Sequence, residues 1–196
     1  MEYYNPIFLI CTFFGVSKLF KRFPGTIGSL IGIPVAYLIN SLSSALLAKT
    51  PLEEFDSYLA HFMMPLILVF ILFLIGVYAS KRYIAASGKS DPGEIIIDEI
   101  VSQTLCILIT LPITFALIYD NLAEKIALYY DIVFIVSILM NVALFRFFDI
   151  LKPWPIRYFE KKITGGFGVM FDDVLAAVFS IVIYFAILFV VIDLYK

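Results

Sequence analysis

The sequence has little charge and few of the side chains that build metal clusters or redox centres. Charged residues make up 15% of its 196 positions, and it contains one histidine, His61, and two cysteines, Cys11 and Cys106. The cysteines lie in apolar surroundings without metal-type spacing, which is typical of small buried hydrophobic side chains. No GxxxxGK[ST] pattern is present, which excludes a P-loop. The net charge of −2 is too small to indicate a nucleic acid as partner.

Apolar residues, by contrast, are abundant. They make up 62% of the chain, and the mean hydropathy is +1.00, whereas soluble domains contain about 45–50% apolar residues. Because a helix needs about 20 apolar residues to cross a bilayer, five stretches qualify as spans. These predicted spans are residues 26–48, 61–80, 95–119, 126–148 and 171–194. We therefore predict an all-α, polytopic membrane helix bundle in which residues 1–196 form a single domain.

The first 22 residues form a different kind of segment. Residues 6–20 are apolar, but this stretch is shorter than a span, and Lys18, Lys21 and Arg22 lie at its end. Such a pattern favours an interfacial or re-entrant helix over a sixth span.

Basic residues are distributed unevenly between the two sets of loops that these spans create. One set carries 11 of the 14 lysines and arginines, and the other carries Lys49, Lys125 and Lys196. By the positive-inside rule, we expect the richer set to face the cytoplasm. Four unusual polar sequences fall on that side: RFPGTIGS, DPGEIIIDE, FRFFDILKPWPIR and TGGFGVMFDD. Polar groups from several helices that meet at one depth are typical of a site in a helical bundle.

The first of these polar sequences allows two interpretations. Pro24 suits the first turn of a helix, where Thr26, Ser29 and their neighbours would leave backbone N–H groups open to an anion. Alternatively, the spacing of Gly28 and Gly32 is typical of close helix packing. The sequence alone favours neither interpretation, and Thr26 and Ser29 stay candidate substrate-binding residues.

Two pairs of adjacent carboxylates lie at the ends of predicted spans. Asp98 and Glu99 follow the point where an apolar span has begun, and no nearby lysine pairs with them, which favours a cation site. Asp172 and Asp173 follow a glycine-rich stretch that predicts a flexible loop. A helix dipole explains one carboxylate at the start of the last span, but it does not explain a pair.

The third polar sequence mixes both signs of charge. Asp149 lies three residues after Arg146, so an ordinary ion pair on one helix face is an alternative to a metal site there. Lys152 and Arg157 follow closely, and we expect them to bind a phosphate together with Arg146. Backbone N–H groups near Gly166 would assist them.

Carboxylates without accompanying histidine or cysteine suit Mg²⁺, which typically shares its coordination with a phosphate. Carboxylates, a metal and basic side chains together indicate phosphoryl-transfer chemistry. His61 lies on the predicted outer side and neither cysteine is followed by an arginine six residues later, which argues against a histidine or cysteine nucleophile. Metal-activated water and an aspartate nucleophile remain as alternatives. The predicted metal ligands are Asp98, Glu99, Asp149, Asp172 and Asp173.

The segments PGTIGS, DPGEIIIDE, FRFFDILKPWPIRYF and GGFGVMFDDVLAA together resemble the phosphatidylglycerophosphatase A family of bacterial inner-membrane lipid phosphatases. The similarity covers residues 24–180, with the four motifs in family order. It implies a multi-pass membrane phosphatase that uses Mg²⁺ to hydrolyse phosphatidylglycerophosphate to phosphatidylglycerol and inorganic phosphate at the cytoplasmic face. The chain departs from the family pattern where Ala176–Ala177 replaces the usual Ala-Gly, and in its longer apolar N-terminal segment.

The resemblance also implies which side chains act in the reaction. The family's Asp-Glu, Phe-Asp, Lys-Pro and Asp-Asp motifs correspond to Asp98–Glu99, Asp149, Lys152 and Asp172–Asp173. From this set we expect Asp98, Asp149 and Asp173 to be catalytic, without assigning which of them binds metal and which acts on water.

A small divalent-cation transporter that uses the same carboxylates is the main alternative. A transporter places acidic groups near the middle of the bilayer and often contains internal repeats, whereas these acids cluster at one rim and the two halves show no repeat. A non-catalytic membrane subunit is a further alternative, but it has no use for the five carboxylates at the rim.

Overall fold

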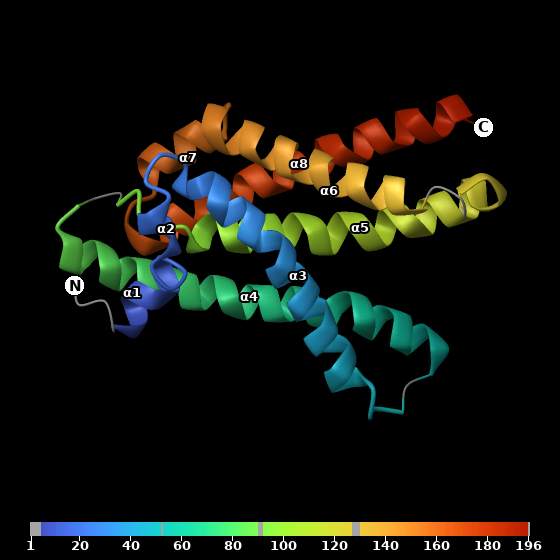
Figure 1. The fold of residues 1–196 in the computed structure, drawn as a ribbon, viewed down its shortest axis with the longest axis horizontal. Coiled ribbons are helices and arrows are strands. Elements are labelled where there is room, and N and C mark those ends of the chain that lie inside the picture. Colours follow the sequence, from blue (N-terminus) through green and yellow to red (C-terminus); the bar gives the residue numbers. More distant parts are fainter. Residues whose placement is uncertain (1–4, 52, 90–91, 127–129, 196) are drawn as a thin grey trace.

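The computed structural model describes residues 5–51, 53–89, 92–126 and 130–195, and in these residues the chain is helical, without strands. Five of the helices are long and apolar enough to cross a membrane, which confirms the predicted bundle (Figure 1). The helices are α1 (Pro6–Cys11), α2 (Val16–Leu19), α3 (Pro24–Leu47), α4 (Glu54–Ser87), α5 (Ile97–Ile126), α6 (Tyr130–Leu151), α7 (Ile156–Lys162) and α8 (Gly165–Tyr195).

Several predicted span boundaries are wrong by a turn or more. The span predicted over 61–80 belongs to α4, which continues for about two turns beyond it at each end, and the last span begins at Gly165 rather than at residue 171. Residue 126 ends α5 and does not begin the next span, which starts at Tyr130. Hydropathy marks where a helix is apolar, but a helix continues into the polar zone as long as its backbone hydrogen bonds do. For this reason Lys81 and Arg82 are helical, and the predicted glycine loop is the first turn of α8.

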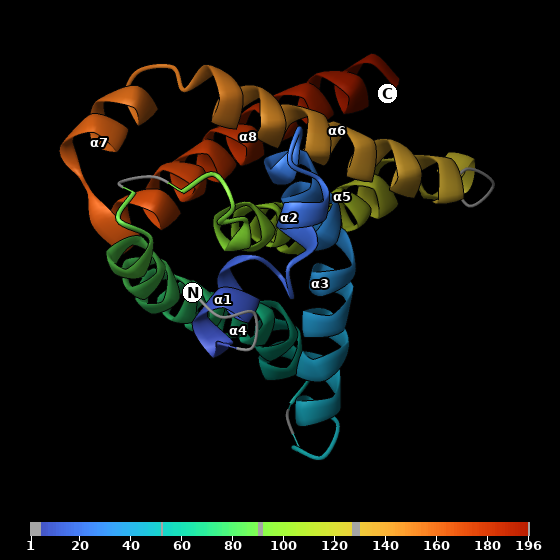
Figure 2. The same cartoon turned by 60° about the vertical axis from the view of Figure 1, so that its left-hand side comes forward.

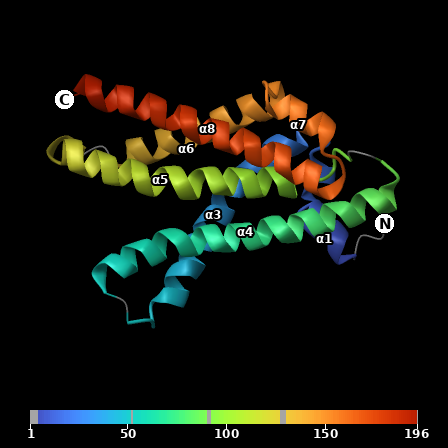
Figure 3. The same cartoon turned by 180° about the vertical axis from the view of Figure 1, so that it is seen from behind.

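Helix α5 lies in the middle of the bundle. Figure 2 shows α3, α4, α6 and α8 around it, and Figure 3 shows α4 running beside α5 from behind. In its most apolar stretch, 56% of the α5 residues are buried inside the protein, against 22–33% in the other four spans. The short helices α1, α2 and α7 gather at one end of the bundle, and the C-terminus lies at the other (Figure 1).

Glycines allow α3 to approach α5 closely. A Cβ atom at Gly28 would lie 3.1 Å from the Ile96 carbonyl oxygen, and one at Gly32 would lie 2.8 Å from the Cβ of Gln103. Thr104 uses this proximity, because its hydroxyl donates a hydrogen bond to the carbonyl oxygen of Gly32 (3.1 Å). The packing interpretation of these two glycines is therefore confirmed.

Polar but uncharged side chains join the central helices deeper in the bundle. Thr110 donates to the Asn141 side-chain oxygen at 3.1 Å, which links α5 to α6. Thr114 and the Tyr184 hydroxyl lie 2.9 Å apart and link α5 to α8. Such hydrogen bonds are the usual polar contacts between membrane helices.

The N-terminal segment forms two helices too short to span a membrane, as the sequence predicted. Its backbone is fixed to the beginning of α5, because Ile96 donates its N–H to the carbonyl oxygen of Cys11 (2.8 Å) and the Ser17 hydroxyl donates to that of Glu94 (2.7 Å). Burial raises the pKa of Cys11 to about 12, so its thiol stays protonated and serves in packing. Leu19 and Phe20 are exposed, which suits a helix at the membrane interface.

The close contact between α4 and α8 leaves no room for a side chain at Gly166. We expect Gly166→Ala to lower the melting temperature in detergent, because the added Cβ would meet the backbone of Val77 and Lys81. Overpacking of this kind costs about 1–3 kcal/mol. Gly93→Ala is the matched control, since a Cβ there meets no atom within 4 Å. Equal melting temperatures for the two variants would contradict the packing described.

Candidate active site

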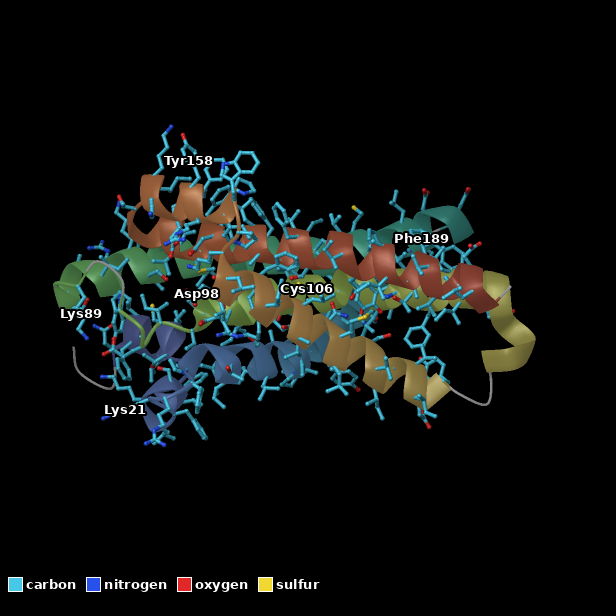
Figure 4. All side chains as sticks on the ribbon, turned by 90° about the horizontal axis from the view of Figure 1, so that it is seen from above. Lys21, Lys89, Asp98, Cys106, Tyr158 and Phe189 are labelled. Carbon is cyan, nitrogen blue, oxygen red and sulfur yellow. The ribbon has the colours of Figure 1, made fainter. Side chains whose placement is uncertain are left out.

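The four polar sequences meet at one end of the bundle around a cavity of about 720 Å³. Its walls come from the beginnings of α3, α5 and α8, the end of α6, and α7 with its flanking turns. Figure 4 shows Asp98 near this end, with Lys21 and Lys89 beyond it and Cys106 and Phe189 further along the bundle. The charged side chains in the wall are Arg22, Asp98, Glu99, Arg146, Asp149, Lys152, Glu160, Asp172 and Asp173.

Three carboxylates form the centre of the site. Asp98 and Glu99 lie in the first turn of α5 and Asp173 in the third turn of α8, and each offers an oxygen within 4.8 Å of the other two. Asp98 and Asp173 are 8% and 4% exposed, so water screens their charges poorly. Glu99 Oε2 and Asp173 Oδ2 are buried and accept no hydrogen bond in the described part of the chain. Such a donor set fits a cation that prefers oxygen ligands.

Asp149 lines the cavity but is engaged by a basic neighbour. Arg146 donates to Asp149 at 2.5 Å, which confirms the ion pair that the spacing of three residues on α6 suggested. The same Arg146 Nη1 lies 3.9 Å from Glu99 Oε1 and so connects α6 to α5. Gly25 leaves the room that this arrangement needs, since a Cβ there would meet both Glu99 and Arg146.

Asp172 is paired with Lys152, which comes from the turn after α6. The ammonium group of Lys152 donates to Asp172 and also to Glu160, the latter at 2.9 Å. A φ of 41° at Lys152 turns the chain out of α6 at this point. Partial burial works against the charged ammonium, but the hydrogen bond and charge of Asp172, with Glu160, raise the pKa of Lys152 above its usual range. Asp172 Oδ1 has no hydrogen-bond partner among the described residues.

The remaining predicted substrate-binding residues do not all reach the cavity. Thr26 lines it, whereas Ser29 is fully buried and donates to the carbonyl oxygen of Gly25 at 3.0 Å. Gly166 packs against α4, and the neighbouring glycines 165 and 168 line the cavity instead. Arg157 is exposed on α7 and is not part of the cavity wall.

Sequence reasoning missed Arg22 and Glu160 as residues of the site. Arg22 counted only toward the charge asymmetry between loops and the basic end of the N-terminal segment, although it lies two residues before the PGTIGS motif. Glu160 reaches Lys152 because α7 folds back after the two prolines of the KPWP sequence. The two prolines, at positions 153 and 155, are the sequence signal that could have predicted the reversal of the chain between α6 and α7.

The Ala176–Ala177 departure from the family pattern lies one turn below the carboxylates. Both alanines are fully buried, and the thiol of Cys106 contacts the carbonyl oxygen of Ala177 at 3.7 Å. Small side chains therefore still allow α8 to pack closely on α5 at this position.

Comparison with known proteins identifies the family. The family model described as phosphatidylglycerophosphatase A matches residues 9–188, a longer stretch than the motifs cover. The phosphatidylglycerophosphatase A of Haemophilus influenzae is 36% identical over 183 residues, which cover 93% of this chain and 89% of that protein. That of Escherichia coli K12 is 31% identical over 182 residues, which cover 92% and 83%. No solved structure gives a significant match.

The resemblance predicted from the four motifs is thus confirmed over most of the chain, and the motif carboxylates lie together in one cavity. The chain belongs to the phosphatidylglycerophosphatase A family.

Proposed function

We propose that this chain hydrolyses phosphatidylglycerophosphate to phosphatidylglycerol and inorganic phosphate, with Mg²⁺, at the cytoplasmic face of the bacterial inner membrane. Membership of the family makes it a phosphoric monoester hydrolase with several membrane helices, and both relatives are named phosphatidylglycerophosphatase A. The observation that carries the proposal is the group Asp98, Glu99 and Asp173, buried together beside Arg146 and Lys152.

Asp98, Glu99 and Asp173 would hold the metal, with Asp149 and Asp172 beside them. Bound Mg²⁺ would supply positive charge that offsets the negative charge of the phosphate oxygens, and it would lower the pKa of a bound water. Among the described residues, Glu99 Oε2, Asp172 Oδ1 and Asp173 Oδ2 are buried and accept no hydrogen bond, so each is available as a ligand atom.

Arg146 and Lys152 are placed to hold the phosphate of the substrate. Lys152 has three N–H donors, of which Asp172 and Glu160 accept two. Arg146 Nε is buried and donates to no partner in the described residues. Both side chains therefore keep a donor for a phosphate oxygen, and Thr26 adds a hydroxyl to the same wall.

In the proposed reaction, a water oxygen attacks phosphorus and the bond from phosphorus to the glycerol oxygen breaks. One carboxylate accepts the proton of the water and passes it to the leaving glycerol oxygen. The oxygen of Asp173 that does not hold the metal can accept this proton, whereas Asp149 already accepts a hydrogen bond from Arg146. Asp98 is the other candidate, because it lies within the same group of carboxylates.

The distribution of charged residues supports the proposed orientation of the bundle in the membrane and favours a phosphatase over a transporter. Lys21 and Lys89 lie at the same end of the bundle as Asp98 (Figure 4), and by the positive-inside rule this end faces the cytoplasm. The side chains that join the helices deeper in the bundle, such as Thr110, Asn141 and Tyr184, are uncharged. A cation transporter would need carboxylates at that depth, so the observed placement favours the phosphatase.

Removal of divalent metal tests the cofactor. We expect phosphate release from detergent-solubilised phosphatidylglycerophosphate to stop in excess chelator and to return when Mg²⁺ is added, because the buried carboxylates need a cation to bind an anionic substrate. The control is an equal ionic strength of NaCl in place of MgCl₂. Equal rates with chelator and with Mg²⁺ would remove the metal from the proposal.

Substitution of single carboxylates tests the ligand group. We expect Asp98→Asn and Asp173→Asn each to lower kcat by about 10²- to 10⁴-fold, since each removes a charged oxygen from the site. Asp193→Asn makes the same change on α8 at the opposite end of the bundle, where the side chain is exposed, and should keep normal kcat. Melting temperatures in detergent would establish that all three variants are folded. Near-normal kcat in Asp98→Asn or Asp173→Asn would exclude that residue.

Lys152→Met tests the phosphate-binding role of Lys152. Loss of a charged hydrogen bond is worth about 1.5–3 kcal/mol, so kcat/KM should fall about 10- to 100-fold. Lys161→Met on the exposed surface of α7 is the control. The raised pKa of Lys152 keeps its ammonium protonated as pH rises, so the ratio of wild-type to variant kcat/KM should be constant between about pH 6 and 9. A ratio that falls toward 1 by the upper limit would show that Lys152 loses its proton earlier.

A further inference from the structure

We infer that the lipid substrate reaches the cavity from the bilayer between α3 and α6, and that Phe23 and Ile150 contact its acyl chains on the two sides of this opening. The inference rests on the proposed function, since it concerns how the diacylglycerol part of that substrate is accommodated. It identifies an acyl-chain contact site and two residues that determine selectivity for long-chain lipids.

Two of the seams between neighbouring helices are closed by glycine contacts at the level of the carboxylates. Between α4 and α8, Gly166 lies against the backbone of α4, and a Cβ at Gly76 would lie 2.6 Å from the Met170 methyl group. Between α3 and α5, Gly28 and Gly32 bring the two helices into contact. No room for an acyl chain is left where such backbones touch.

The contact of α8 with α5 and α6 is also closed. It is filled by fully buried side chains one turn and more below the carboxylates, among them Cys106, Phe145 and Ala176. An apolar groove of about 390 Å³ does lie among α4, α5 and α8. It is lined by Phe167, Phe171 and Val174, however, and these lie on the opposite side of α8 from Asp172 and Asp173. That groove therefore does not lead into the cavity.

The seam between α3 and α6 is different, because a side chain and not backbone closes it at the cavity. Arg146 reaches across from α6, and a Cβ at Gly25 would lie 2.7 Å from its Nη1 atom. Figures 1 and 2 show that α3 and α6 come together at the cavity end and run apart from there. A flexible arginine that also binds the phosphate can accommodate a lipid headgroup that enters here.

Phe23 and Ile150 mark the membrane side of this opening. Both line the cavity, yet 67% and 68% of their surfaces remain exposed. The other exposed side chains in the wall, such as Arg22, Glu160 and Thr164, are polar and suit water. The cavity thus has a polar side, from which phosphate can leave, and an apolar side that faces lipid.

An apolar track continues from this opening along both helices. Leu30 lies two turns into α3, seven residues after Phe23, and is 47% exposed. Phe147 lies three residues before Ile150 on α6 and is also exposed. An acyl chain that leaves the cavity between Phe23 and Ile150 would continue along these side chains into the bilayer.

The test compares a long-chain phosphatidylglycerophosphate with a water-soluble short-chain form in detergent micelles. Ile150→Asp places a charge in the opening, and we expect it to lower the ratio of long-chain to short-chain kcat/KM about tenfold. Leu151→Asp is the matched control, since Leu151 is 58% exposed and adjacent but does not line the cavity. This variant should keep the wild-type ratio. Equal ratios in the two variants would overturn the inference.

A second pair of variants keeps the test decisive if a charge at this position prevents folding. Phe23→Ala should lower the same ratio, whereas Phe20→Ala, which removes an exposed ring outside the cavity wall, should not. An unchanged ratio in Phe23→Ala would also overturn the inference. Failure of the proposed function is a separate result, because the wild-type protein would then hydrolyse neither substrate.

Discussion

Six carboxyl groups line the cavity at one end of this bundle, and the need to balance their charge governs the arrangement around them. Arg146 neutralises Asp149 and reaches Glu99, and Lys152 neutralises Asp172, which leaves Asp98 and Asp173 without a basic partner among the described residues. Buried charges are tolerated only when other charges or ligands compensate them. A divalent cation would compensate this excess of negative charge, and the anionic substrate would then bind to the cation.

Close contacts between helices bring these charged side chains together. Gly28 and Gly32 seat α3 against α5, and Gly166 seats α8 against α4. Small buried side chains, Ala176 and Ala177 on α8 and Cys106 on α5, bring these two helices together, so the first turn of α5 lies beside the third turn of α8 and Asp98 meets Asp173. The packing glycines and the carboxylates thus belong to the same motifs for a physical reason, since the chemistry needs the proximity that the glycines allow.

The sequence was sufficient for the bundle, for the five spans and for the carboxylates that meet, because apolar length and charged residues inside it are strong local signals. It was insufficient where a role depends on which surface a residue faces in the folded chain. Gly166 and Ser29 looked like anion-binding residues and are packing residues, because each lies on the side of its helix that faces a neighbour. The pairing of Lys152 with Asp172 and Glu160 depends on the turn at Lys152, which no periodicity reveals.

The order of these charges along the chain has a consequence for membrane insertion. Arg146 and Lys152 are synthesised before Asp172 and Asp173, so the last helix brings its two carboxylates to a bundle end that already carries both basic side chains. A lone carboxylate is costly inside a bilayer, and a waiting cation reduces that cost. Asp98 and Glu99, in the first turn of α5, can stay in contact with headgroup water until then. Insertion of the helices in the order of synthesis would therefore complete the site with the final helix.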